Sequence, residues 1–208
     1  MFSLPAMATS RAAHRPSFSD FKPDTLRGAL GFFRVGQTHA GHWWLLDALD
    51  RPFFSKGVTA VNRAGTAGGR WAPRGPYVDT IDARFGAGDP GPFVEDVIAR
   101  LRAWDFNTLA AWTTPEFFDR GMPYMDILDF RKISDHAFRL GPASLPDVFD
   151  PRWIEACDRW AGEVCTPQQE SRLLIGYFTD HELGWAQFPA DPVPGAPLRP
   201  TLLPICLS

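Results

Sequence analysis

The stretch Leu-Leu-Ile-Gly-Tyr-Phe-Thr-Asp-His-Glu-Leu-Gly-Trp, residues 173–185, decides the fold class. Its first seven residues form a short apolar run, which is typical of a strand buried in a parallel sheet. The polar residues Asp180, His181 and Glu182 follow directly. Polar side chains just past a buried strand are typical of α/β folds, in which functional residues lie at the carboxyl ends of the strands.

Earlier segments of the chain show the same alternation of strands and helices. Short apolar runs predict strands over residues 107–112 and 123–130. Helical spacing, with Asp-Pro start signals, predicts helices over residues 93–104 and 151–164. A short helix is predicted over residues 114–121. This alternation implies parallel strands with right-handed crossovers, and therefore an α/β fold.

The segment before the first helix predicts a β-hairpin and a long loop. Residues 43–47 and 52–62 are apolar runs separated by a polar turn, so we predict a hairpin whose second arm continues as a buried strand. Residues 63–91 are rich in Gly, Pro, Arg and Asp and are too long for a passive connector. We therefore expect about four β/α units preceded by a β-hairpin.

Composition divides the chain into three segments. Residues 1–30 mix Pro, Ser and basic residues without a sustained period, which predicts a poorly ordered lead-in. Residues 31–187 carry the predicted strands and helices and form the expected domain. Residues 188–208 are a Pro-rich tail.

Charge and hydropathy exclude several classes of partner. The net charge of -3 and the pI near 5.9 provide no field that would attract nucleic acid or an anionic membrane. The chain starts without a basic region followed by an apolar run, and no stretch approaches the ~20 apolar residues of a membrane span. We expect a soluble chain without nucleic-acid or membrane partners, and the lack of a clear signal peptide favours a cytoplasmic location.

The sequence gives no strong signal for a metal or a cofactor. The three cysteines are odd in number and lack CxxC spacing, which argues against a disulfide framework and a cysteine zinc site. His39 and His42 would have to join His181 and Glu182 to form a metal site. A His-x-x-His pair outside a predicted helix is weak evidence for that alternative, so we expect no metal and no cofactor.

Eight tryptophans are unusual for this length. An indole face can stack on the apolar C–H face of a sugar ring or fill a core. Trp104, Trp153 and Trp160 sit at helical core spacing, so we predict that they are structural. Trp112 and Trp185 follow strands and are the candidates for stacking.

The residues that follow the predicted strands supply the groups that sugar recognition needs. Amides, carboxylates and an imidazole bind hydroxyls, indoles stack on rings, and a carboxylic acid can protonate a glycosidic oxygen. Asp129 is also at a strand end, where we expect it to be a structural hydrogen-bonding residue. The candidate site residues are Asn62, Trp112, Asp180, His181, Glu182 and Trp185.

Three segments resemble a known family of enzymes. Residues 53–62, 146–153 and 174–185 are similar to the corresponding segments of β-agarase-like hydrolases, which belong to the retaining-glycosidase clan built on (β/α)8 TIM barrels. The resemblance covers about residues 32–187. It implies that the four β/α units are the N-terminal half of such a barrel, and that the substrate is a polysaccharide or oligosaccharide.

The resemblance also implies catalytic roles. In that clan an Asn-Glu pair ends the fourth strand, the Glu acting as general acid/base, and a second Glu after the seventh strand is the nucleophile. Glu182 occupies the acid/base position, and His181 stands in place of the Asn. The implied reaction is cleavage of β-glycosidic bonds in a galactan such as agarose by a retaining mechanism.

Four strands supply only half of a barrel and one of its two carboxylates. We therefore expect no activity from the isolated chain. The alternative is a truncated, non-catalytic remnant that binds sugar or has no function. The two open edges and the uncovered apolar face of a half-barrel would favour self-association.

Overall fold

The computed structural model of the chain describes residues 15–64, 77–133 and 146–181. The chain divides into two compact units, Met1–Ser55 and Lys56–Ser208, and each is described by itself. The segment boundaries expected from composition, after residues 30 and 187, stay predictions.

The first unit holds a three-stranded antiparallel sheet in the order β1-β2-β3. β2 pairs with β3 through Leu45 and Phe53, which confirms the predicted hairpin. β1, which pairs with β2 along its whole length, was not predicted. The strand bounds are β1 Arg34–Gln37, β2 Trp43–Leu46 and β3 Pro52–Phe53.

The described part of the lead-in contacts this sheet. Residues 15–30 contain two turns of 3-10 helix, η1 Phe18–Asp20 and η2 Pro23–Thr25, and isolated bridges join Phe21 to Thr38 and Arg27 to Val35. Phe21 is buried. A Cβ at Gly36 would come within 3.0 Å of the Phe21 ring, so the absence of a side chain at residue 36 allows this close packing.

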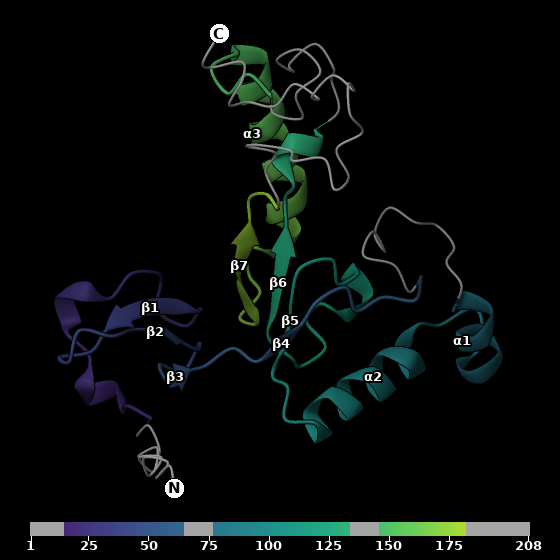
Figure 1. Cartoon of the computed structure of the whole chain (residues 1–208), viewed down its shortest axis with the longest axis horizontal. Coiled ribbons are helices and arrows are strands. Elements are labelled where there is room, and N and C mark those ends of the chain that lie inside the picture. Colours follow the sequence, from purple (N-terminus) through teal and green to yellow (C-terminus); the bar gives the residue numbers. More distant parts are fainter. Residues whose placement is uncertain (1–14, 65–76, 134–145, 182–208) are drawn as a thin grey trace, which may run out of the picture. The chain divides into compact units, whose positions relative to one another are not determined.

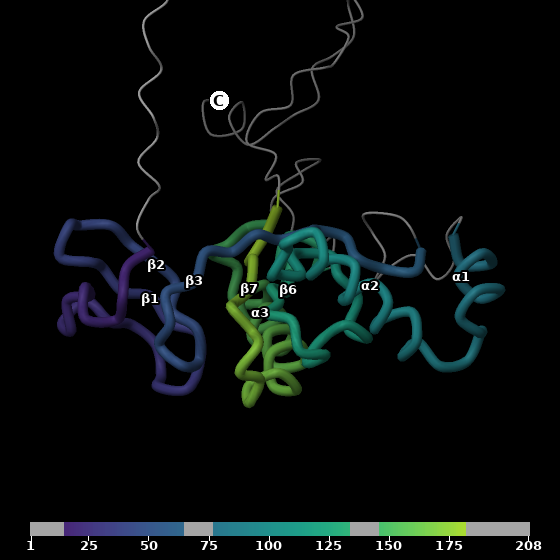
Figure 2. Tube along the Cα trace, turned by 90° about the horizontal axis from the view of Figure 1, so that it is seen from below, coloured from purple at the N-terminus to yellow at the C-terminus, as the bar shows by residue number. Residues whose placement is uncertain are grey.

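The second unit holds a four-stranded parallel sheet in the order β4-β5-β6-β7, which confirms the mixed α/β class (Figure 1). β6 and β7 share the longest ladder and run side by side in both views of the chain (Figures 1 and 2). The strands are shorter than predicted. Their bounds are β4 Gly57–Val58, β5 Thr108–Leu109, β6 Tyr124–Ile127 and β7 Leu174–Phe178.

Of the three α-helices in the described residues, two were predicted. Asp150 caps α3 by accepting a hydrogen bond from the Arg152 backbone, and Pro at the first turn suits both α2 and α3. The helix bounds are α1 Val78–Phe85, α2 Gly91–Ala103 and α3 Pro151–Cys165.

Two helix predictions need correction. α1 lies within residues 63–91, which were predicted to be loop because the segment is rich in Gly and Pro. None of its residues is fully buried, but Ile81 and Phe85 are spaced along one face and pack against the core of the second unit. The helix predicted over residues 114–121 is a single 3-10 turn, η3 Pro115–Phe117. It stops because Phe118 is extended and Asp119 has a φ of 55°.

The core of the second unit lies under α2. The Phe93 and Phe117 rings meet edge to face with centroids 5.7 Å apart, and the Phe118 and Tyr124 rings stack at 4.3 Å. The other apolar side chains of the cluster fill the space between α2, β5 and β6. The buried cluster is Phe93, Val94, Val97, Ile98, Leu101, Leu109, Phe117, Met122 and Tyr124.

α3 is packed differently. Although it is longer than α2, only Ala156 is buried, and it attaches to the sheet by a hydrogen bond from Trp160 Nε1–H to the Leu128 carbonyl, 2.7 Å. Trp160 is half-buried, as expected of a structural residue. Trp104 was wrongly predicted as core: its side chain is 62% exposed because it follows the last turn of α2 and leaves the buried face.

Candidate functional site at the carboxyl ends of the strands

Backbone hydrogen bonds continue past the ends of β4 and β5. Ala110 N–H donates to the Val58 carbonyl at 2.8 Å, and Ala60 N–H donates to the Ala111 carbonyl at 2.9 Å. Thr114 N–H then reaches the Val61 carbonyl at 3.1 Å. The two loops that leave these strands are therefore tied together where site residues are expected.

The ends of β6 and β7 are tied in the same way. Leu128 N–H donates to the Phe178 carbonyl at 2.8 Å, and Phe130 N–H donates to the Thr179 carbonyl at 3.0 Å. The last link involves a side chain, because Arg131 N–H donates to Asp180 Oδ1 at 2.8 Å. This hydrogen bond ties the loop after β6 to Asp180, the residue that directly precedes His181.

Three of the strand ends carry a residue other than glycine in the left-handed region. The φ angles are 55° at Ala60, 63° at Trp112 and 55° at Asp129. This conformation costs about 1–2 kcal/mol for a residue with a Cβ. Each left-handed residue turns the chain away from the sheet after the ladder ends. Non-glycine residues held there are concentrated at functional sites.

Two of the predicted site residues meet in the structure. The Trp112 and His181 rings lie edge to face, with centroids 4.5 Å apart and an interplanar angle of 83°. Trp112 follows β5 and His181 follows β7, and β6 lies between these strands in the sheet. The pair therefore places an indole and an imidazole together at the carboxyl edge.

Asn62 and Asp180 have structural hydrogen bonds. Asn62 Nδ2 donates to the Ala60 carbonyl at 2.8 Å, which supports the left-handed turn after β4. Asp180 is half-buried and accepts the Arg131 backbone hydrogen bond described above. Their expected role in binding substrate stays a prediction, as do the roles of Glu182 and Trp185, which lie outside the described residues.

Burial and nearby charges together raise the pKa of the Asp180 carboxyl. Burial raises the pKa of the Asp180 carboxyl above its ordinary value, and the nearby carboxylate of Asp129 adds to the rise. The Arg131 backbone hydrogen bond and the charges of Arg131 and Lys132 oppose it. Asp180 therefore takes up a proton more readily than an exposed aspartate does.

Asp129 forms ion pairs with Arg131 and Lys132, and these ion pairs were not predicted from the sequence. Asp129 is 3% exposed, Lys132 Nζ contacts Oδ2, and Arg131 Nε lies 3.8 Å from Oδ1. The Asp129 carboxylate was expected to be structural, and the sequence signal for its ion pairs is the basic pair Arg131–Lys132, two and three residues later. Asp126, also overlooked, is buried within β6, where Oδ2 accepts a hydrogen bond from Gln168 Nε2 at 3.0 Å.

The Cys157 thiol, in α3, is close enough to Asp180 to be influenced by its charge, and it is a poor nucleophile. Burial raises the pKa of its thiol to about 11, and Asp180 and Asp158 contribute in the same direction. The thiol is therefore protonated at neutral pH, and the thiolate is the reactive form.

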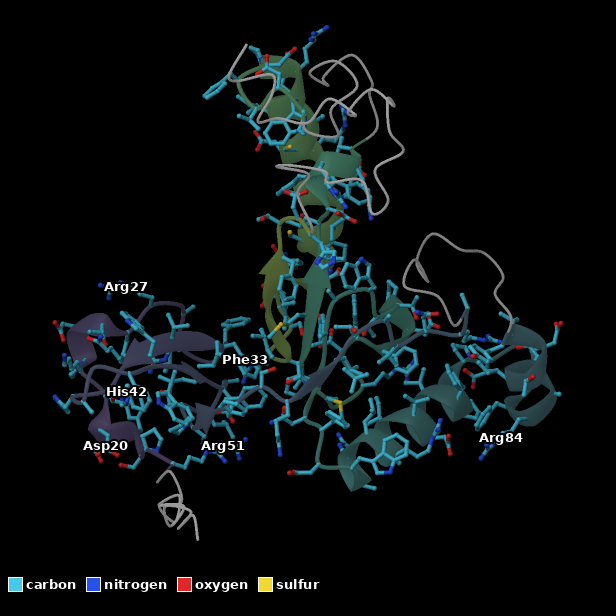
Figure 3. The ribbon with its side chains drawn as sticks, viewed as in Figure 1. Asp20, Arg27, Phe33, His42, Arg51 and Arg84 are labelled. Atoms are coloured by element: carbon cyan, nitrogen blue, oxygen red, sulfur yellow. The ribbon has the colours of Figure 1, made fainter. Side chains whose placement is uncertain are left out.

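A hollow of about 510 Å³ in the first unit is lined by His39, His42, Trp44 and Asp20, among others. Figure 3 labels Asp20 and His42. Within residues 15–64, 77–133 and 146–181, no three His, Cys, Asp or Glu side chains are grouped to hold a metal ion. Among those same residues, no helix has the length and apolar character needed to cross a bilayer.

Known proteins resemble this chain in sequence and in fold. No family model matches it. Beta-agarase A of Vibrio sp. (strain JT0107) is 25% identical over 193 residues, covering 70% of this chain and 19% of the relative. The agarase AgWH50C superposes with a TM-score of 0.61 at 22% identity, covering 85% of this chain and 33% of its own. PfGH50B gives 0.61 at 19% identity, with coverages of 82% and 32%.

These matches define the chain as a mixed α/β protein with the fold of part of an agarase structure. The resemblance to β-agarase-like glycoside hydrolases, predicted from three sequence segments, is confirmed. The chain spans about a fifth of the curated relative and a third of the solved structures, which fits a match to the N-terminal half of the catalytic fold.

Proposed function

We propose that this chain contributes the acid/base half of a glycosidase that cleaves β-glycosidic bonds of a galactan such as agarose. The observation that carries the proposal is the Trp112–His181 ring pair at the carboxyl edge of the sheet. An indole beside a hydrogen-bonding imidazole suits a sugar ring with its hydroxyls. The similarity to Beta-agarase A supports the choice of polysaccharide.

Glu182 is the proposed general acid/base, because it directly follows His181 in the sequence. In the first step its carboxylic acid donates a proton to the glycosidic oxygen as the bond to the anomeric carbon breaks, while a second carboxylate attacks that carbon. In the second step the Glu182 carboxylate removes a proton from water, which displaces the enzyme carboxylate and restores the acid.

A retaining mechanism requires the two carboxylates about 5–5.5 Å apart. Asp129 and Asp180 are the carboxylates at the described strand ends; Asp129 Oδ2 contacts Lys132 Nζ, and Asp180 Oδ1 accepts the hydrogen bond from Arg131 N–H within the loops. We propose that the nucleophile lies outside these 208 residues, and that the chain alone binds agaro-oligosaccharides without hydrolysing them.

Reducing-end assays with agarose, run beside calorimetric titration with agaro-oligosaccharides, test this. We expect binding without turnover from the 208-residue chain, and binding that weakens in His181→Ala. Turnover that disappears in Glu182→Gln would contradict the missing nucleophile. Absence of sugar binding would contradict the proposed function and favour a remnant without a function.

The four parallel strands fit half of a (β/α)8 barrel, which we propose as the architecture. A half-barrel has two open edges, and unpaired edge groups and exposed apolar area favour association. We therefore propose that the isolated chain self-associates. Sedimentation velocity is expected to show a dimer or larger species, and a compact monomer across the concentration range would contradict this proposal.

A further inference from the structure

A pocket of about 250 Å³ lies between α3 and the 3-10 helix η4 Phe130–Lys132, which follows β6. α3 contributes four of the lining residues, and the segment that runs from the end of β6 through η4 contributes the other four, Leu128, Asp129, Lys132 and Ile133. The candidate site residues Asn62, Trp112, Asp180 and His181 do not line it. The pocket is therefore distinct from the four described candidate residues of the proposed site.

The apolar side of the pocket is formed by two buried side chains and a hydrogen-bonded indole. Leu128 and Ala156 are buried, and the Trp160 side chain lines the pocket beside them. The hydrogen bond from Trp160 Nε1–H to the Leu128 carbonyl holds the indole in one orientation. A fixed indole is a suitable wall for the C–H face of a ring, because no side-chain freedom has to be lost on binding.

The polar side of the pocket has a buried acceptor. Asp129 is 3% exposed, and Lys132 Nζ contacts its Oδ2. Its Oδ1 lies 3.8 Å from Arg131 Nε and accepts no hydrogen bond from the described residues. A buried carboxylate oxygen without a hydrogen bond costs free energy, which a donor from a ligand would recover. Arg159 and Glu163, exposed on α3, add one donor and one acceptor at the rim.

The charges of the lining residues and the volume of the pocket limit the class of ligand that it can bind. The formal charges of Asp129 and Glu163 are offset by those of Lys132 and Arg159, so the lining favours a neutral molecule. The volume is below the ~300–1,000 Å³ of drug-sized ligand sites, which suits a single ring. We propose that this pocket binds one neutral sugar ring through its hydroxyls. The choice of a sugar among neutral polyols rests on the proposed function.

The Trp160 indole N–H is a reporter inside the pocket, and its NMR signal can be assigned by comparison with Trp160→Phe. We expect millimolar D-galactose to shift this signal, with inositol as the polyol control. Glu163→Gln is expected to weaken the response about tenfold, because it removes a charged acceptor at the rim. The matched control is Glu155→Gln, an equally exposed glutamate of α3 that does not line the pocket.

Ala156→Leu provides a second variant, since the added methyl groups should fill the pocket and abolish the response, with cooperative melting as the check on folding. A galactose shift of the Trp112 signal alone would overturn this second site while supporting the proposed function. Shifts of neither signal would overturn both. Equal responses to inositol and galactose, or equal effects of Glu163→Gln and Glu155→Gln, would also overturn the inference.

Discussion

The two helices α2 and α3 are attached to the parallel sheet by different kinds of interaction. We call the two parts of the second unit the α2–β5 half and the α3–β7 half. α2 buries five apolar side chains against β5 and its neighbours, whereas the longer α3 buries only Ala156, and β7 has no buried residue. The α3–β7 half is attached by directed polar links: Trp160 to the Leu128 carbonyl, and the Arg131 backbone to Asp180. Apolar packing therefore stabilises one half, and hydrogen bonds position the other.

The largest contrast should appear in stability. Phe117→Ala is expected to lower the free energy of unfolding by about 3–5 kcal/mol, because a fully buried ring is removed from the α2 core. Ile154→Ala in α3, where the side chain is 47% exposed, should cost about 1 kcal/mol or less. Denaturant titrations measure both. Similar losses would show that the two halves are equally packed.

Sugar affinity should depend on aromatic residues at the strand ends. Trp112→Ala is expected to weaken agaro-oligosaccharide binding about tenfold, equivalent to about 1.4 kcal/mol, through loss of a stacking face. Trp185→Ala should act in the same direction. Trp104→Ala is the matched control, since Trp104 is an exposed indole at the end of α2. Calorimetry showing equal affinity for all three variants would remove Trp112 and Trp185 from the site.

The left-handed backbone at Trp112 gives a further way to examine the β5 end. Trp112→Gly should be about 1 kcal/mol more stable than Trp112→Ala, because glycine adopts a φ of 63° without the steric cost of a Cβ. Both variants lack the indole, so the comparison isolates the backbone. Equal thermal stability would mean that this conformation stores no strain.

The smallest expected effect is a change in the pH dependence of stability when Asp180 is replaced. Its pKa is raised in the folded chain, so the folded state retains a proton that the unfolded state has lost, and stability falls as pH rises through the folded-state pKa. Asp180→Asn keeps an oxygen for the Arg131 N–H and should remove this fall. Thermal melts between pH 3 and 8 would show it. Asp158→Asn, an exposed residue of α3, is the control; identical pH profiles for wild type and Asp180→Asn would contradict the expectation.

The sequence predicted the α2–β5 half better than the residues that close the strand ends. Phe93, Val97 and Leu101 have a helical period because a core selects apolar side chains at regular spacing. α1 has a partly buried face that includes Ile81 and Phe85, but its eight residues lie in a segment rich in Gly and Pro, whose composition predicts a loop. The left-handed Trp112 and Asp129 were not predicted either, because the tertiary hydrogen bonds of the residues that follow them, Thr114 to Val61 and Phe130 to Thr179, fix these loops.

The candidate site was predicted to the same limited extent. The order of strands and helices was sufficient to bring Trp112 and His181 to one edge, where the structure pairs their rings. The ion pairs of Asp129 with Arg131 and Lys132 could not be predicted from the sequence. Charge pairing at Lys132 depends on the η4 turn, which only the folded chain defines.

The pairing of β5 with β6 has a consequence for the order of assembly. This contact joins Leu109 to Tyr124, whereas β4–β5 joins Gly57 to Thr108 and β6–β7 joins Tyr124 to Leu174. The entropy lost on closing a loop grows with its length, so the β5–β6 contact costs least to form. We therefore expect the centre of the sheet to form first and β7, the strand that leads to Asp180 and His181, to be added afterwards.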